Sequence, residues 1–139
     1  MAFAACAHRS VGGRLQGTPE AALVGEFEDD YGNRFTITDS EWLQQPNRRY
    51  HIVSWHSDAQ YLIAQNDPAN ASEGGRWTRI DWMRFTGMPP YDWGFCLSAY
   101  AATSAAAAES VQVAQRATPR TGCNGHPFSR MKRAMPKGN

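Results

Sequence analysis

Two runs of β-branched and aromatic residues, 49–55 and 60–66, form the most strongly patterned stretch of the chain. Neither run contains glycine or proline, and the polar residues 56–59 separate them, so the pattern predicts a β-hairpin. Apolar side chains alternate onto both faces of the first run, with Ile52 on one face and Trp55 on the other. Both faces therefore need cover, as in a small closed sheet with one face lining an interior.

Six further runs have strand character and are separated by turns rich in Gly, Pro or Asn: 23–29, 34–38, 41–44, 76–85, 91–100 and 128–131. Short turns join most consecutive runs, which is typical of an antiparallel meander. The Ala-rich residues 105–115 follow Thr103 and Ser104 and predict a helix of about three turns. The sequence thus predicts a mainly β protein, a single antiparallel up-and-down meander or barrel of about eight strands, with one helix before the last strand.

The chain has the length of one domain, at 139 residues. We place the barrel-like domain at residues 23–131. Residues 1–22 lack a strand period and contain three glycines and a proline, so we expect a flexible arm. Residues 132–139 form a basic tail, which we expect to be solvated, with contact to an anionic surface as the alternative.

Charge is almost balanced, with 14 basic and 13 acidic residues, so the composition gives no indication of nucleic-acid binding. No run reaches the length of a transmembrane helix. The start, Phe3-Ala4-Ala5-Cys6, has the small-residue-then-Cys form of a bacterial lipoprotein cleavage site, but without the charged and apolar stretches that precede one. A truncated signal with a lipidated Cys6, giving peripheral membrane anchoring, is one interpretation. The others are an incidental cysteine and an organellar presequence.

Three cysteines allow three pairings. Cys96 lies in the predicted strand 91–100, and Cys123 lies beside Gly122, where the chain returns to the sheet. We therefore predict a Cys96–Cys123 disulfide, which leaves Cys6 for a lipid or for no bond.

The four histidines do not have the spacing of a metal site. His51 and His56 are five residues apart and would lie on opposite faces of a continuous strand, whereas His8 and His126 lie in irregular segments. No serine stands in a nucleophile elbow. We therefore predict no metal, no cofactor and no catalytic residue.

A row of carboxylates, Glu26, Glu28 and Asp30, shares one face of the first predicted strand. We interpret this row as a solvated outer face. Acid–base chemistry by carboxylates inside a barrel is the alternative.

The candidate ligand site lies on the long run 76–85, where Trp77, Arg79 and Asp81 share one face. If that face looks into the barrel, Arg79 and Asp81 form a charged clamp between aromatic walls, suited to a small apolar or aromatic ligand. If it looks outward, they form a surface ion pair worth little. Trp93 joins the set only if the preceding turn puts it on the same face.

The opening LVGEFEDDYGNRFTI resembles the first hairpin of calycins, the lipocalin and avidin-like barrels, through Gly25-Glu26-Phe27 and Gly32. Phe27 stands where those families usually have Trp. The span 24–130 resembles a group of small secreted or lipoprotein-type bacterial domains through the segments YHIVSW, YLIAQND, WTRIDWM, FCLSAYAA and TGCNGHPFSR. These resemblances imply a lipocalin-like barrel that is secreted or in the cell envelope, at the periplasm or outer surface, with no established activity.

Three functions follow from these observations. The first is a noncatalytic, lipocalin-like binding module or envelope protein. The second is a structural or accessory subunit of a larger assembly, which contacts a protein partner through an exposed aromatic surface. The third is a small hydrolase- or isomerase-like enzyme using interior carboxylates. An open cavity with convergent polar groups would favour binding, and a filled barrel with an exposed aromatic patch would favour assembly.

Overall fold

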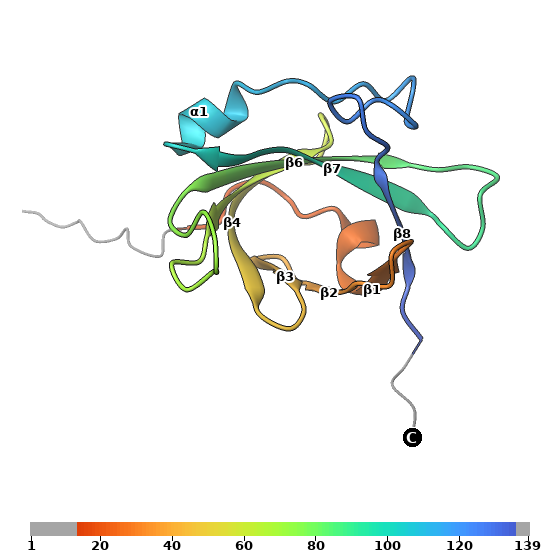
Figure 1. The fold of residues 1–139 in the computed structure, drawn as a ribbon, viewed down its shortest axis with the longest axis horizontal. Coiled ribbons are helices and arrows are strands. Elements are labelled where there is room, and N and C mark those ends of the chain that lie inside the picture. The colour runs from red at the N-terminus through yellow and green to blue at the C-terminus, as the bar shows by residue number, and fades with distance from the viewer. Residues whose placement is uncertain (1–13, 136–139) are drawn as a thin grey trace, which may run out of the picture.

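Eight strands form a closed antiparallel barrel in the order of the chain (Figure 1). The computed structural model describes residues 14–135. The last strand closes the barrel by pairing with both the first strand and the seventh. The strands are β1 (Gly25–Asp29), β2 (Arg34–Ile37), β3 (Glu41–Gln44), β4 (Arg48–His56), β5 (Tyr61–Asn66), β6 (Trp77–Arg84), β7 (Trp93–Ala102) and β8 (Ser129–Arg133). The predicted fold class is confirmed, as is the hairpin, which is formed by β4 and β5.

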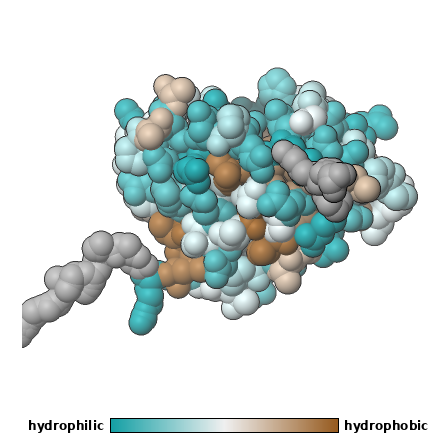
Figure 2. All heavy atoms as spheres, turned by 90° about the horizontal axis from the view of Figure 1, so that it is seen from below, coloured by the Kyte–Doolittle hydropathy of each residue, from teal (hydrophilic) through white to brown (hydrophobic). Residues whose placement is uncertain are grey.

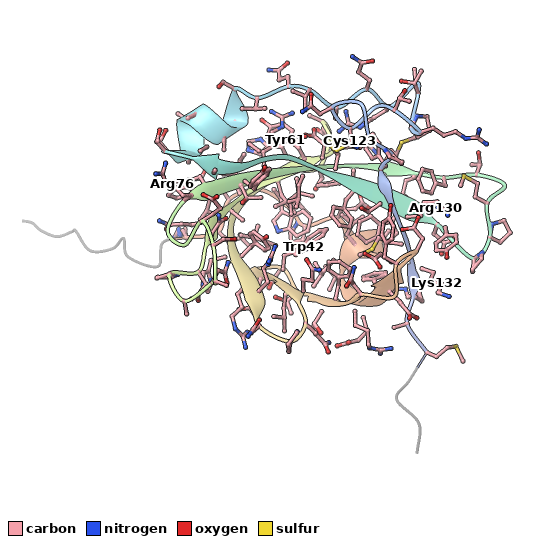
Figure 3. The ribbon with its side chains drawn as sticks, viewed as in Figure 1. Trp42, Tyr61, Arg76, Cys123, Arg130 and Lys132 are labelled. Carbon is pink, nitrogen blue, oxygen red and sulfur yellow. A yellow bond between two sulfur atoms is a disulfide. The ribbon has the colours of Figure 1, made fainter. Side chains whose placement is uncertain are left out.

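Aromatic side chains fill the barrel interior. Because strand residues alternate between faces, each strand sends every second side chain inward, and about half of the buried core residues are Phe or Trp. Trp42 lies in the middle of the barrel (Figure 3), with its ring centroid 5.0 Å from that of Phe95 in an edge-to-face contact. Eight interior aromatic side chains are at most 7% exposed: Phe27, Phe35, Trp42, Tyr50, Trp55, Trp82, Trp93 and Phe95.

Residues before β1 close one side of the barrel. The 3-10 turn η2 (Ala21–Leu23) buries Leu23 completely in the core. The backbone of Gln16 pairs with β4, accepting from Trp55 N at 2.8 Å and donating to Val53 O at 3.1 Å. The partner strand β3 is only four residues long, so these groups of β4 would otherwise lack a partner.

The expectation of a flexible arm applies to residues 1–22. Residues 1–13, which include Cys6, lie outside the described residues, and for them it stays a prediction. Residues 14–22 contact the barrel as described above. At the other end of the chain, Lys132 and Arg133 of the expected basic tail belong to β8.

The helix α1 (Ala105–Glu109) precedes β8 as predicted but is shorter than the expected 105–115. Its start is capped by Ser104, whose side chain accepts from Ala107 N at 3.0 Å. Two β-branched residues, Val111 and Val113, follow the helix and favour extended backbone. The chain then runs along the barrel instead of continuing the helix.

Residues 110–128, which we call the strap, run from α1 to β8 along the outer side of β6 and β7 (Figure 1). The predicted disulfide is confirmed: Cys96 on β7 is bonded to Cys123 in the strap. Cys96 pairs with Asp81 across the sheet, which places it on the outer face. The disulfide therefore ties the strap to the barrel wall.

Removing this tether will destabilise the fold. The double substitution Cys96→Ala and Cys123→Ala opens a loop with a sequence separation of 27 residues. We expect the free energy of unfolding to fall by about 3.5 kcal/mol in urea denaturation, because the unfolded chain gains conformational freedom. The wild-type protein with dithiothreitol should show the same loss. A loss below about 1 kcal/mol would contradict a structural role for the bond.

Candidate functional site

The predicted ligand residues Arg79 and Asp81 lie on the outer face of β6, whereas Ile80 and Trp82 point into the core. Both charged residues are nevertheless buried, with Arg79 7% and Asp81 1% exposed. The reason is the cover provided by α1 and the strap, which pack over this part of β6. The pair is thus neither in a ligand-filled interior nor on a wet surface.

The carboxylate of Asp81 is saturated by hydrogen bonds within the fold. Arg79 donates Nε to Oδ2 at 2.9 Å and Nη2 to Oδ1 at 3.1 Å. Arg116 of the strap donates Nη2 to Oδ1 at 3.1 Å, and the Ser98 hydroxyl donates to Oδ2. Arg79 also donates Nη1 to the carbonyl oxygen of Glu109 at the end of α1. This cluster fastens the helix and the strap to the barrel and leaves no acceptor for a ligand.

The four predicted ligand residues are not brought together. Trp77 is partly exposed on the outer face, while Trp93 is 1% exposed in the core. The register pairs Trp93 with Arg84, which shares its face with Trp82 and not with Asp81. Trp93 therefore belongs to the aromatic core, on the opposite face of the sheet from Arg79.

A small polar group stands beside the Asp81 cluster. The His56 ring stacks on Tyr61 with centroids 4.3 Å apart, and Tyr61 donates its hydroxyl to Glu109 Oε2 at 2.7 Å. Burial, followed by this hydrogen bond, raises the pKa of Tyr61. His56 Nε2 faces both Ser54 Oγ at 3.1 Å and Glu109 Oε2 at 3.6 Å. Because serine and carboxylate meet the same ring nitrogen, they cannot form a proton relay through the ring.

The remaining buried carboxylate, Asp29, is also engaged by the fold. It accepts from the backbone N of Tyr31 and Asn33 and from Asn33 Nδ2, and so fixes the β1–β2 turn. Glu26, of the predicted carboxylate row, is exposed. In the described part of the chain, no group of three His, Cys, Asp or Glu residues could hold a metal ion.

A lateral groove with a volume of about 590 Å³ lies outside the barrel. We use this name for the space between the β1–β2 turn, the β6–β7 turn, the strap and the start of β8. Its apolar wall consists of Phe85, Met88, Pro119, Pro127 and Phe128. Its polar residues are Asp30, Tyr31, Arg120 and Arg130.

The floor of the groove is fixed by packing. Phe128 is 2% exposed, and its backbone N donates to Pro119 O at 2.9 Å. Phe85 lies directly over Gly94 of β7, where an added Cβ would come within 2.7 Å of the ring. Glycine at position 94 therefore permits Phe85 to lie flat on the sheet. At the rim, Tyr31 is 75% and Met88 36% exposed.

The groove carries positive charge. Arg130 projects from β8 (Figure 3) and donates Nε to Asp30 Oδ2 at 2.8 Å. This hydrogen bond raises the pKa of Arg130. Its guanidinium also lies 4.8 Å from the centroid of the Tyr91 ring. Arg120 is exposed and has no ion pair with any residue in the range 14–135.

Two smaller pockets differ from the groove in their chemistry. One, of about 220 Å³, is lined by Tyr50, Asn66, Leu97 and Tyr100 among others. Asn66 is saturated there, because its Nδ2 donates to Glu73 O and Tyr100 O while its Oδ1 accepts from Thr78. The other, of about 350 Å³, lies along the β4–β5 turn and is mostly open. Charged residues line both, Arg48 and Glu73 in the first and Asp58 in the second, but both are smaller than the groove.

The sequence did not reveal the lateral groove, because four separate segments form it. Tyr31 was read as part of a turn and Arg130 as part of a strand, and neither has a partner at a regular spacing. The one local signal in the sequence is an aromatic residue, Tyr31, in a Gly-containing turn. The groove depends on the path of the strap over β7, of which the sequence indicates one point, the disulfide at Cys123.

The fold and site define a closed eight-stranded antiparallel barrel with a filled interior and a lateral groove. The chain matches no protein-family model, and searches among curated proteins and solved structures find no match either. In the described part of the chain, no helix is long and apolar enough to span a membrane. Functional assignment therefore rests on the geometry of the groove.

The hydrogen bonds of Asp81 with Arg79, Ser98 and Arg116 should stabilise the fold by holding the strap on β6. We expect Asp81→Ala to lower the free energy of unfolding by about 3–5 kcal/mol in urea denaturation, because Arg79 is left buried without its partner. The control is Glu41→Ala, whose pair with Arg49 is 31% and 43% exposed at the two side chains. This control should cost at most about 1 kcal/mol. Equal losses in both variants would show that the cluster does not hold the strap.

Proposed function

We propose that this chain is a noncatalytic small-molecule-binding barrel that holds its ligand in the lateral groove. The observation that carries the proposal is a cavity of about 590 Å³ with an apolar wall and two guanidinium groups. Small-molecule sites have this size and this composition, a mostly apolar lining with a few placed polar groups. The polar groups that converge on this cavity, Arg120 and Arg130 among them, therefore lie outside the barrel.

The barrel interior does not support ligand binding of the calycin type. Its aromatic side chains contact one another, as Phe27 and Trp93 do with centroids 5.2 Å apart. A ligand inside would have to displace such side chains, each of which contributes several kcal/mol to stability. The calycin resemblance therefore concerns the barrel fold, and it does not extend to the position of the proposed ligand site.

An extracytoplasmic location, secreted or in the cell envelope, is part of the proposal. The Cys96–Cys123 disulfide supports it, because disulfides persist in oxidising compartments and are rare in the cytosol. Lipidation of Cys6 and peripheral membrane anchoring stay predictions. Cys6 lies outside the described residues.

The second candidate function is an accessory subunit of a larger assembly. The filled interior favours it, as does the exposure of Tyr31 and Met88 at the groove rim. However, the face seen in Figure 2 is mostly hydrophilic, with only small hydrophobic patches. On that face, a protein partner would find no broad apolar surface.

The binding function is tested with a neutral apolar probe, N-phenyl-1-naphthylamine, whose fluorescence rises on transfer from water. We expect saturable binding with one site per chain, weakened about tenfold or more by Tyr31→Ala, because an aromatic wall is lost. Tyr100→Ala is the matched control, since Tyr100 is 55% exposed but lines the 220 Å³ pocket instead.

Two results would contradict the proposal. Loss of binding in Tyr100→Ala with retention in Tyr31→Ala would place the site at the other pocket. Absence of saturable binding by the folded wild-type protein would contradict the proposed binding function.

A further inference from the structure

The lateral groove presents unused hydrogen-bond donors from a fixed guanidinium. Arg130 uses only Nε for its bond to Asp30, and its two Nη atoms make no hydrogen bond with any described residue. Its side chain is 43% exposed, so those donors are open to solvent. Because Asp30 and the Tyr91 ring fix the orientation of the guanidinium, its donors are arranged before any ligand arrives.

A second guanidinium lies at the same groove. Arg120 is exposed and makes no hydrogen bond with any residue from 14 to 135. Its backbone is positioned by its neighbour Pro119, which accepts from Phe128 N, and by the disulfide at Cys123. The strap therefore carries a free cation to the rim of an apolar cavity.

The charges in the groove do not balance. Two arginines and one aspartate line it, which leaves an excess of one positive charge. Asp30 Oδ2 accepts from Arg130, and Oδ1 has no hydrogen-bond partner but is buried, out of reach of a ligand that enters from solvent. Lys132, whose Nζ lies 5.9 Å from the centroid of the Tyr91 ring, is opposite Glu28 across β8 and β1, so this pair leaves the excess unchanged. One negative charge on the ligand would complement this set.

The wall of the groove specifies the rest of the ligand. Phe85 and Phe128 provide two aromatic side chains in the floor, and Tyr31 provides a third at the rim. An inorganic anion would leave the exposed surface of Phe85 and Tyr31 uncovered, whereas a planar aromatic body would bury it above the floor formed by Phe128. A carboxylate on that body can take two parallel hydrogen bonds from a guanidinium.

We propose that the lateral groove is specific for an aromatic carboxylate, with the ring against Phe85 and Phe128 and the carboxylate held by Arg120 and the Nη edge of Arg130. This inference rests on the proposed binding function and gives it a ligand class. Charge-assisted hydrogen bonds to the carboxylate supply the specificity, so a neutral ligand of the same shape binds more weakly.

The test compares naphthalene-2-carboxylate with naphthalene-2-carboxamide by isothermal titration calorimetry on the full chain. The two ligands have nearly the same shape and differ in charge. We expect the carboxylate to bind at least about tenfold tighter, and this advantage to shrink as NaCl is raised. Arg120→Gln should remove most of this advantage, with Arg130 retaining the rest, while leaving the affinity for the amide unchanged.

The matched control is Arg76→Gln, because Arg76 is exposed at the side of the barrel away from β8 (Figure 3) and should not alter either affinity. Equal affinities of the wild-type protein for carboxylate and amide would overturn the inference and leave the proposed binding function standing. Failure of both ligands to bind while N-phenyl-1-naphthylamine binds would overturn it as well. An equal effect of Arg76→Gln and Arg120→Gln would show attraction by overall charge instead of a site.

Discussion

The closed barrel depends on the mutual packing of aromatic side chains in its interior. A barrel of eight strands encloses a space that side chains can just fill, and here Phe and Trp residues fill it. Their edge-to-face contacts join strands far apart in the chain, as when Phe35 of β2 lies 5.7 Å from Phe95 of β7. Because this packing occupies the interior, the binding site that we propose lies on the outside.

The outer face of β6 and β7 is the part of the barrel wall that a second layer covers. The Asp81 cluster and the disulfide hold this layer in two different ways, one by buried hydrogen bonds and one covalently. Both are needed because the strap has little regular structure of its own and contributes few large apolar side chains. The lateral groove lies where the strap meets β8. Changes that loosen the strap should therefore also alter the shape of the groove.

Sequence patterns predicted the strands and the disulfide, because both follow from local spacing and from the return of the chain to the sheet. They also placed Arg79 and Asp81 on one face, where the two residues do pair. A period of two cannot say which face points inward, and it cannot fix the register that puts Trp93 in the core. The helix was overextended, because residues 110–115 contain no Gly or Pro to end it, while the contacts of Arg116 require the chain to follow the barrel.

The central claim is that ligands bind outside a filled barrel. It is tested most directly by NMR of the ¹⁵N-labelled protein during titration with N-phenyl-1-naphthylamine, whose ring currents shift nearby signals. The account predicts shifts of the backbone amides of Tyr31, Met88 and Arg120, while the indole N–H signals of Trp42 and Trp82 stay unchanged. Shifts of those two interior indoles with unchanged groove amides would place the ligand inside the barrel and contradict the account.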